Sequence, residues 1–247
     1  MLVPHSKTTM IPRLFLLASL TTTLVLATEE MMMISDFSLS DGEYLEMETV
    51  DDPVMGGTSS STFEILEGEY LEWSGTVEIV DYLNSPGFCI LQTKDDDEDF
   101  TGLGKQSGIS FFVEKSTMDT MLQPMSAQLT TGAISSTNGE IITYEGELRT
   151  CELRAGIMDD TMLVELFVPW GEFKPTFRGF VVDDAPLLTA EELDKTYRIG
   201  LSTYSSHSAG DFTVKLIKIA ARAADSEVCI SPIAASDNDG GGSGATW

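Results

Sequence analysis

Histidine, the side chain that most often moves a proton near neutral pH, is scarce in this chain. The 247 residues include two histidines, His5 and His207. We expect His5 to be removed with a targeting segment, and His207 lies in the polar run 205–208, which predicts an exposed turn. One imidazole cannot build a zinc site with several histidine ligands, and no Gly-x-Ser-x-Gly motif is present to hold a nucleophilic serine. The sequence therefore predicts a protein that is not an enzyme and uses no cofactor.

Acidic residues are so numerous that no single pair of them indicates a chemistry. The chain has 40 Asp and Glu against 14 Lys and Arg, for a formal net charge of −26, and a carboxylate pair for glycoside hydrolysis could be chosen almost at will. The densest acidic run is 95–99. Its Asp95, Asp97 and Asp99 are candidate calcium ligands, because Ca²⁺ binds several carboxylate oxygens, but a solvated acidic loop explains the same run. We expect no bound metal and keep these three residues as candidates.

One segment combines turn formers with side chains suited to binding. Asp52 precedes a proline, and Gly56 and Gly57 permit a positive φ or a close approach of the backbone. Three serines then lead into a strand, so the segment can be explained as a corner tied by side-chain hydrogen bonds. Alternatively, it lines a binding face together with Trp and Arg side chains, which are common at protein and ligand interfaces. The candidates for that face are Asp52, Met55, Gly56, Gly57, Trp170 and Arg178.

The elements that must position these residues are strands, because apolar residues recur at every second position in four stretches. We expect each alternating set to face the core, which assigns Trp73 to packing and Glu165 to the opposite face of its strand. The sets are Leu71, Trp73, Val77 and Ile79; Ile109, Phe111 and Val113; Met162, Val164, Leu166 and Val168; and Tyr197, Ile199 and Leu201.

The remaining signals fit the same architecture. Between 211 and 221 the apolar phase changes after Leu216, which indicates a bulge or a strand that is covered on both faces. A helix signature is present at 189–194, where Thr189 as N-cap and Glu192 form a capping box. Many half-buried strands with short turns predict an all-β fold, an antiparallel β-sandwich or jelly roll with one short helical turn.

The N-terminus has the layout of a secretory signal peptide. Lys7 and Arg13 precede an apolar run that ends at Ala27, and small or aliphatic residues flank the expected cleavage site. This layout predicts the secretory pathway or the extracellular space, although the frequent Thr and Ser leave an organelle presequence open. We assign 1–27 to a signal peptide or other targeting segment, 28–35 to a linker, 36–223 to the folded domain and 224–247 to a flexible tail.

The negative charge restricts the partners of the mature protein. It repels the phosphates of nucleic acids and the head groups of anionic lipids, so we expect no nucleic-acid binding. No apolar stretch beyond the targeting segment approaches the roughly 20 residues that a spanning helix needs, so we expect no direct membrane insertion after cleavage.

Three cysteines allow one internal disulfide and leave one thiol over. Cys89 lies in the apolar run 88–91, which predicts a buried free thiol. Cys151 and Cys229 are the candidate pair if the compartment is oxidising.

Six short segments occur in order along the predicted domain. They are Asp-Asp-Pro-Val-Met-Gly-Gly-Thr-Ser-Ser at 51–60, Leu-Glu-Trp-Ser-Gly at 71–75, Gly-Phe-Cys at 87–89, Val-Pro-Trp-Gly-Glu-Phe-Lys-Pro-Thr-Phe-Arg-Gly at 168–179, Arg-Ile-Gly-Leu at 198–201 and Gly-Asp-Phe-Thr-Val-Lys-Leu at 210–216. Together they resemble the complex I intermediate-associated protein 30 family, over about 36–223.

The resemblance implies a galactose-binding-like jelly roll, which agrees with the period of two. It also implies a chaperone-like role in the assembly of mitochondrial NADH:ubiquinone oxidoreductase, with an assembling subunit of that membrane complex as protein partner. A mitochondrial location follows as the alternative to the secretory one. The alternative function is a secreted or lumenal carbohydrate-binding jelly roll, whose ligand is a glycan.

Overall fold

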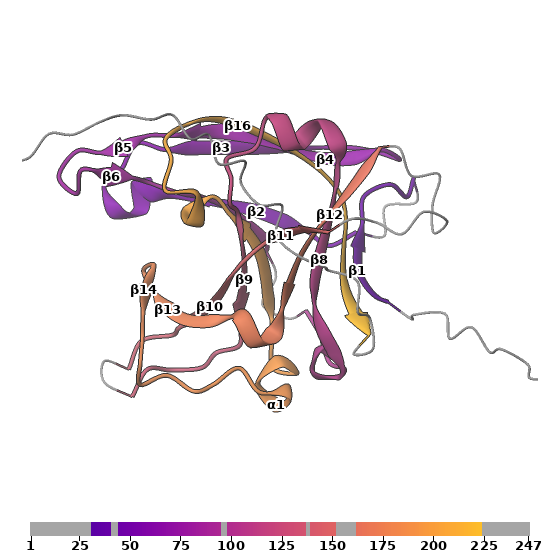
Figure 1. Cartoon of the computed structure of the whole chain (residues 1–247), viewed down its shortest axis with the longest axis vertical. Helices are drawn as coiled ribbons and strands as arrows, with labels where there is room; N and C mark the ends of the chain where they lie inside the picture. Colours follow the sequence, from indigo (N-terminus) through magenta and orange to yellow (C-terminus); the bar gives the residue numbers. More distant parts are fainter. Residues whose placement is uncertain (1–30, 41–43, 95–97, 137–138, 152–161, 224–247) are drawn as a thin grey trace, which may run out of the picture.

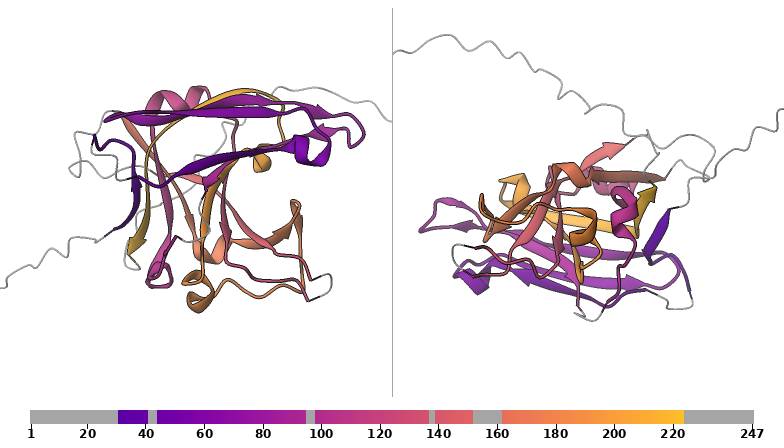
Figure 2. Two further views of the ribbon diagram at one scale, coloured as in Figure 1. Left: turned by 180° about the vertical axis from the view of Figure 1, so that it is seen from behind. Right: turned by 90° about the horizontal axis from the view of Figure 1, so that it is seen from below.

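Antiparallel strands make up most of the protein. The computed structural model describes residues 31–40, 44–94, 98–136, 139–151 and 162–223. Within these ranges the strands form two large sheets that pack on one another, as Figure 1 and Figure 2 show from three directions. The predicted all-β sandwich is therefore confirmed. The targeting segment 1–27 and the tail 224–247 lie outside the described residues.

Each large sheet contains seven of the described strands. Sheet A has the order β11 (Arg149–Cys151), β12 (Leu163–Pro169), β8 (Gln106–Glu114), β16 (Gly210–Ala223), β4 (Tyr70–Val77) and β3 (Ser60–Leu66), and β1 (Met32–Asp36) pairs with β16. Sheet B has the order β14 (Phe180–Val181), β13 (Lys174–Phe177), β10 (Thr143–Glu147), β9 (Ser126–Thr130), β15 (Arg198–Ser202), β7 (Cys89–Thr93) and β2 (Met47–Asp51). A separate small hairpin pairs β5 (Ile79–Val80) with β6 (Ser85–Pro86).

Helical structure in the described ranges is limited to single turns. The α-helical turn α1 (Ala190–Leu193) begins at the predicted N-cap, where the Thr189 hydroxyl accepts a hydrogen bond from the Glu192 amide at 3.2 Å. Sequence analysis did not predict the five 3-10 turns, which are too short for a periodic signal. They are η1 (Asp52–Met55), η2 (Leu103–Lys105), η3 (Lys115–Asp119), η4 (Trp170–Glu172) and η5 (Tyr204–Ser206).

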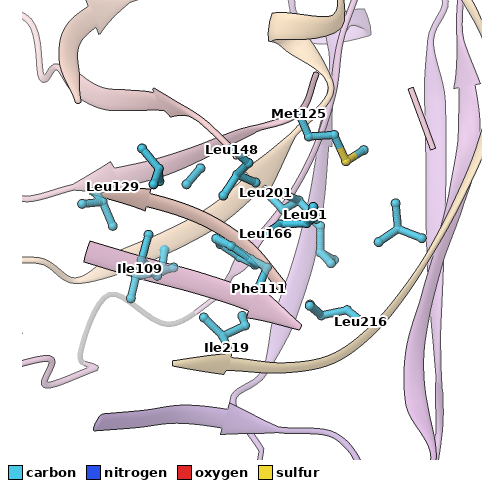
Figure 3. Close-up of a cluster of buried hydrophobic side chains, with 14 of the residues drawn as sticks. Leu91, Ile109, Phe111, Met125, Leu129, Leu148, Leu166, Leu201, Leu216 and Ile219 are labelled. Carbon is cyan, nitrogen blue, oxygen red and sulfur yellow. The ribbon is translucent and has the colours of Figure 1, made fainter. Parts of the chain in front are cut away.

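The core lies between the two sheets and is built from the alternating positions. Phe111 and Leu166 of sheet A meet Leu129 and Leu201 of sheet B, and Figure 3 shows these side chains converging from both layers. Trp73 is fully buried and meets the ring of Phe212 edge-on, at 4.7 Å between centroids.

Three members of the predicted core sets are wrong. Tyr197 is half-buried and does not belong to the core cluster, because it precedes the first residue of β15. Ile79 is exposed, because β4 ends at Val77 and the chain turns into the β5–β6 hairpin, where a new alternation begins. Met162 is exposed because it precedes the first residue of β12. Alternation of apolar residues predicts which face of a sheet a side chain occupies only within one continuous strand.

The phase change in the last strand is a bulge, as predicted. In β16, Leu216 pairs with Val113 of β8, but Lys218 pairs with the preceding residue, Phe112, so Ile217 is the extra residue. Beyond the bulge Ile219 points to the core. The bulge lets one strand pair with β4 over its first half and with β8 and β1 over its second half.

The domain begins earlier than the sequence suggests. β1 covers Met32–Asp36, most of which lies in the segment 28–35 that the sequence analysis assigns to a linker. Met32 and Ile34 pack against the core, which explains why these residues form a strand. Within the described ranges, no helix has the length and apolar character needed to cross a bilayer.

The central position of Phe111 leads to a stability prediction. Phe111→Ala should lower the free energy of unfolding by about 3–5 kcal/mol, because it removes buried apolar surface and leaves a cavity between the sheets. Leu187→Ala, at a position 79 % exposed, is the control and should change the stability by less than about 0.5 kcal/mol. Urea unfolding followed by tryptophan fluorescence measures both, and equal effects would contradict this assignment of the core.

Candidate functional site

A groove runs along the outer face of sheet B, opposite the core. One part of it is a cavity of about 340 Å³ beside the β5–β6 hairpin, and shared lining residues connect this cavity to two further hollows along β10 and β13. Figure 1 shows the hairpins β5–β6 and β13–β14 on the same side of the molecule, and residues of both line the cavity. We call it the sheet B groove; Phe88, Glu145, Arg178, Gly179, Tyr204 and His207 line it.

The floor of the groove is polar. Glu145 of β10 pairs with Gln128 of β9, so both side chains lie on this face, and the Glu145 carboxylate accepts a hydrogen bond from the Ser126 hydroxyl at 2.6 Å. Burial raises the pKa of Glu145 above its ordinary value, and the hydrogen bond from Ser126 opposes this shift. Burial, and secondarily the charge of Glu145, also raise the pKa of the Tyr204 phenol.

The rim of the groove is apolar and exposed. Tyr82 and Leu83 form the tip of the β5–β6 hairpin, and Phe180 and Val181 form β14 on the other side. Phe180 is 74 % exposed. Isolated apolar residues on a surface are ordinary, but four that border one groove indicate a contact surface.

A strained turn places a cation between these apolar residues. Phe177 pairs with Phe180, so Arg178 and Gly179 form a two-residue hairpin turn, and both have positive φ, 51° and 78°. This is the backbone of a type I′ turn, in which a residue other than Gly, Asn or Asp is unfavourable. The guanidinium lies 5.1 Å from the centroid of the Phe177 ring. Among the described residues Arg178 forms no ion pair, although the chain has 40 acidic residues.

The glycine of this turn has a packing role. A Cβ at Gly179 would lie 2.2 Å from the ring of Tyr204, so the missing side chain lets the hairpin pack on that ring. Tyr204 in turn meets the ring of His207 at 6.0 Å between centroids. His207 is exposed in a turn with φ 48°, as the sequence predicts.

Asp52 lines the cavity beside the β5–β6 hairpin and is only 1 % exposed. Its carboxylate accepts hydrogen bonds from the Ser59 amide and the Ser59 hydroxyl, both at 2.8 Å, and the Ser59 oxygen accepts one from the Glu78 amide at 2.9 Å. A second pair repeats the arrangement, since Asp51 accepts from the amide and the hydroxyl of Ser61. The segment is thus a corner tied by side-chain hydrogen bonds, and it also contributes to the groove.

Among the other predicted binding-face residues, some line the groove and some do not. Gly57 lines the cavity, and a Cβ there would lie 2.3 Å from the Asp52 carboxyl carbon; Gly56, with φ 87°, closes η1. Met55 belongs to η1, but its side chain lies outside the part that the structure describes.

Trp170 is placed away from the groove. Its indole N–H donates to the Gln106 carbonyl at 2.9 Å, and its ring packs against Phe173. These contacts anchor η4 to β8. The structure therefore brings Asp52, Gly57 and Arg178 to one cavity, and Trp170 is not part of its lining.

The calcium candidates are described in part. Asp99 accepts a hydrogen bond from the Thr101 amide at 2.9 Å, and Asp95 and Asp97 lie outside the described residues. In the part of the chain that the structure describes, no group of three or more His, Cys, Asp or Glu side chains is placed to hold a metal ion.

The cysteines differ in state. Cys89 is a buried free thiol, as predicted, and burial, followed by the charge of Asp51, raises its pKa. Cys151 takes part in a disulfide, and Cys229, its predicted partner, lies outside the described residues.

Sequence analysis missed Glu145 and Tyr204. Glu145 follows the buried Tyr144 in a clean alternation, which assigns it to the outer face of a strand. No local signal shows that β9 lies beside β10 and that β15 lies beside β9, and this order of strands makes the groove.

Comparison with known proteins identifies one family. The family model described as Complex I intermediate-associated protein 30 (CIA30) matches residues 35–114, from β1 to the end of β8. The resemblance indicated by the sequence motifs is thereby confirmed over this part of the chain, which includes Asp52 and the β5–β6 hairpin. Arg178 and Tyr204 lie beyond the matched residues. A comparison with curated proteins finds no match.

The closeness of Gly87 to Asp52 yields a prediction about the corner. A Cβ at Gly87 would lie 1.5 Å from an Asp52 carboxylate oxygen. Gly87→Ala should therefore displace the carboxylate from Ser59 and lower the free energy of unfolding by about 1–3 kcal/mol. In Gly171→Ala, the matched control, the added Cβ meets no atom within 4 Å. Urea unfolding compares the two variants, and a Gly87→Ala protein as stable as Gly171→Ala would refute the tight contact.

The raised pKa of Glu145 yields a prediction about pH. The pKa of this carboxyl is higher in the folded protein than its unperturbed value of 4.5. Its ionised form therefore costs stability at neutral pH, and the cost disappears as the pH falls below the unfolded-state pKa. Glu145→Gln keeps an acceptor for Ser126 and removes the charge. We expect this variant to be more stable than the wild type at pH 7 and equally stable near pH 4, as measured by thermal unfolding.

The control for this pH measurement is Glu147→Gln, at an exposed position on the same strand. A stability difference between Glu145→Gln and the wild type that is constant across the pH range would contradict the explanation by burial.

Proposed function

We propose that this chain is a non-enzymatic, chaperone-like binding module that assists the assembly of the mitochondrial NADH:ubiquinone oxidoreductase, and that the sheet B groove holds its protein partner. The family match over 35–114 supports the assembly role, because the name of that family refers to an intermediate of complex I. It also supports a mitochondrial location over the secretory one that the segment 1–27 predicts.

The observation that carries the proposal is the combination, at one groove, of an apolar rim and a cation that forms no ion pair with the described residues. Phe180, Leu83 and Arg178 line the same cavity. Trp, Tyr, Phe and Arg side chains dominate the energetics of protein interfaces, and a partner segment that covers the rim would remove these apolar side chains from water.

The charge of the chain favours the same type of partner. The chain is strongly acidic, but the lining of the groove also contains cations, namely Arg178, Lys174 and Arg149. We expect a partner segment that offers apolar side chains to the rim, a carboxylate or carbonyl to Arg178 and basic residues to the surrounding acids.

The polar floor supports a second candidate function. Glu145, Gln128 and Tyr204 combine hydrogen-bonding groups with a ring edge in a hollow on the outer face of a sheet, an arrangement that suits the hydroxyls and the apolar face of a sugar. A carbohydrate-binding module that uses the same groove is therefore the alternative.

The assembly role can be tested in cells that lack this chain. Native gels should show less of the mature NADH dehydrogenase and more of its partial assemblies, and wild-type chain should restore the complex. Arg178→Glu and Phe180→Asp should restore less than about half as much, since charge reversal and an acid on the rim each remove a central contact. Leu187→Asp, an exposed apolar position away from the groove, is the control and should restore the complex fully.

Two results would reject the assembly role. One is normal assembly of the complex in cells without the chain. The other is entry of residues 1–35, fused to a fluorescent protein, into the secretory pathway. Binding of the purified protein to members of a glycan array, abolished by Glu145→Gln, would instead support the carbohydrate alternative.

A further inference from the structure

Sheet A has an open edge at β3. The order of strands places β3 at one end of the sheet, so its one neighbour among the described strands is β4. Edge strands are usually protected from further pairing by a proline, a lysine, a bulge or a short length. β3 covers Ser60–Leu66, contains neither proline nor lysine, and pairs with β4 without a shift of register. It therefore lacks all four protections, whereas β11, at the opposite end of the sheet, has only 3 residues.

One hydrogen bond shows which backbone groups of β3 point outward. The Ser61 amide donates to the Asp51 carboxylate at 2.8 Å, so it points away from β4. Because the backbone groups of an antiparallel strand alternate in direction, the N–H and C=O groups of Phe63 and Ile65 point to the same side. Neither of these two amides donates to a described residue. Asp51 thus occupies the first outward position of the edge and leaves the next two open.

The side chains at the two open positions are incompletely covered. Phe63 and Ile65 pack against the core between the sheets, but both are only half-buried. Residues directly opposite one another in neighbouring strands share a face, so a strand added beside β3 would place side chains over these two. Apolar residues there would remove the remaining surface of Phe63 and Ile65 from water.

The outer face of β3 carries an acid without a counter-charge. Glu64 is exposed and lies directly opposite Glu72 of β4, a position at which like charges repel. Neither carboxylate forms an ion pair with a described residue. Lys215, the next residue in this row, pairs with Glu114 instead.

An acid elsewhere on the same face of sheet A is neutralised within the chain. Glu165 of β12 also points away from the core, but it is 1 % exposed and pairs with Arg222. The row through Glu64 and Glu72 is open to solvent at the β3 edge. A basic side chain on an added strand, opposite Glu64, would supply the missing counter-charge.

The same acid disfavours a second copy of this chain as the occupant. Two antiparallel β3 strands use all of their open groups only where Phe63 pairs with Ile65 of the other copy, because each Ser61 amide is already bonded to Asp51. That register places the two copies of Glu64 directly opposite one another, where they repel. The edge therefore rejects itself and favours a strand of opposite charge.

We propose that β3 is a docking edge for an extended segment of another protein, which adds to sheet A as a further antiparallel strand and carries a lysine or arginine between two apolar residues. The backbone of the segment bonds with Phe63 and Ile65, and its basic side chain lies opposite Glu64. In such strand addition the backbone hydrogen bonds give affinity and the side chains give specificity. The β3 edge shares no residue with the lining of the sheet B groove, so this inference does not rest on the proposed function.

The test uses the purified protein and three synthetic peptides of equal length. One peptide alternates valine and lysine, the second has glutamate in place of lysine, and the third has the composition of the first in an order without alternation. Hydrogen exchange is followed at single amides by NMR. In the free protein, we expect Phe63 and Ile65 to exchange faster than Thr62 and Glu64, whose amides point toward β4. The valine–lysine peptide, at about 1 mM, should slow exchange at Phe63 and Ile65 by about threefold or more, and the other two peptides should not.

Glu64→Lys is the variant that decides the specificity, because the side chain is exposed and its replacement leaves the core intact. Relative to the wild type, it should change the ratio of the affinities for the two alternating peptides by about fivefold or more in favour of the valine–glutamate peptide. Glu67→Lys makes the same change of charge at an exposed position just after β3, and should keep the wild-type preference.

Three results would overturn the proposal. The first is exchange at Phe63 and Ile65 as slow as at Thr62 and Glu64 in the free protein. The second is a valine–lysine peptide that fails to protect Phe63 and Ile65, or that protects them no better than the peptide without alternation. The third is an equal peptide preference of Glu64→Lys and Glu67→Lys, which would show that the net charge of the protein, and not a residue opposite Glu64, selects the peptide.

Discussion

The Asp52 carboxylate holds the point where the chain passes from one sheet to the other. β2 belongs to sheet B and β3 to sheet A, and the turn between them is closed by the hydrogen bonds from Asp52 to Ser59. The same serine fixes the start of the β5–β6 hairpin through the Glu78 amide. Because this hairpin borders the sheet B groove, the hydrogen bonds around one buried carboxylate connect the crossing between the two sheets to the candidate site.

The fold class was predictable because burial on one side imposes a period of two on the strands. The prediction succeeds at Trp73, Phe111 and Ile199, which lie inside continuous strands. It fails at Ile79, where a turn separates the residue from β4. It is incomplete at Glu165, since alternation shows which face a side chain occupies and says nothing of what covers that face.

The candidate site was predictable only where a local motif forms it. Asp52, Gly57 and the corner around them are recognisable because turn formers and serines cluster in one segment. Arg178 was selected for its residue type, and its positive φ has no signature in the sequence. Glu145 and Tyr204 are brought together by the order of strands in sheet B. That order cannot be predicted from the local sequence around either residue. Trp170 lies outside the lining of the groove, and its indole N–H donates to the backbone carbonyl of Gln106.

The position of β16 has a consequence for how the molecule is made. This strand pairs with β8, β4 and β1, yet its residues are 210–223 of 247. Sheet A is therefore completed by a strand that is distant in sequence from its neighbours β4 and β8. Pairing between such distant segments is slow because a long loop must close first, so we expect the other strands of sheet A to be open to aggregation until β16 is in place.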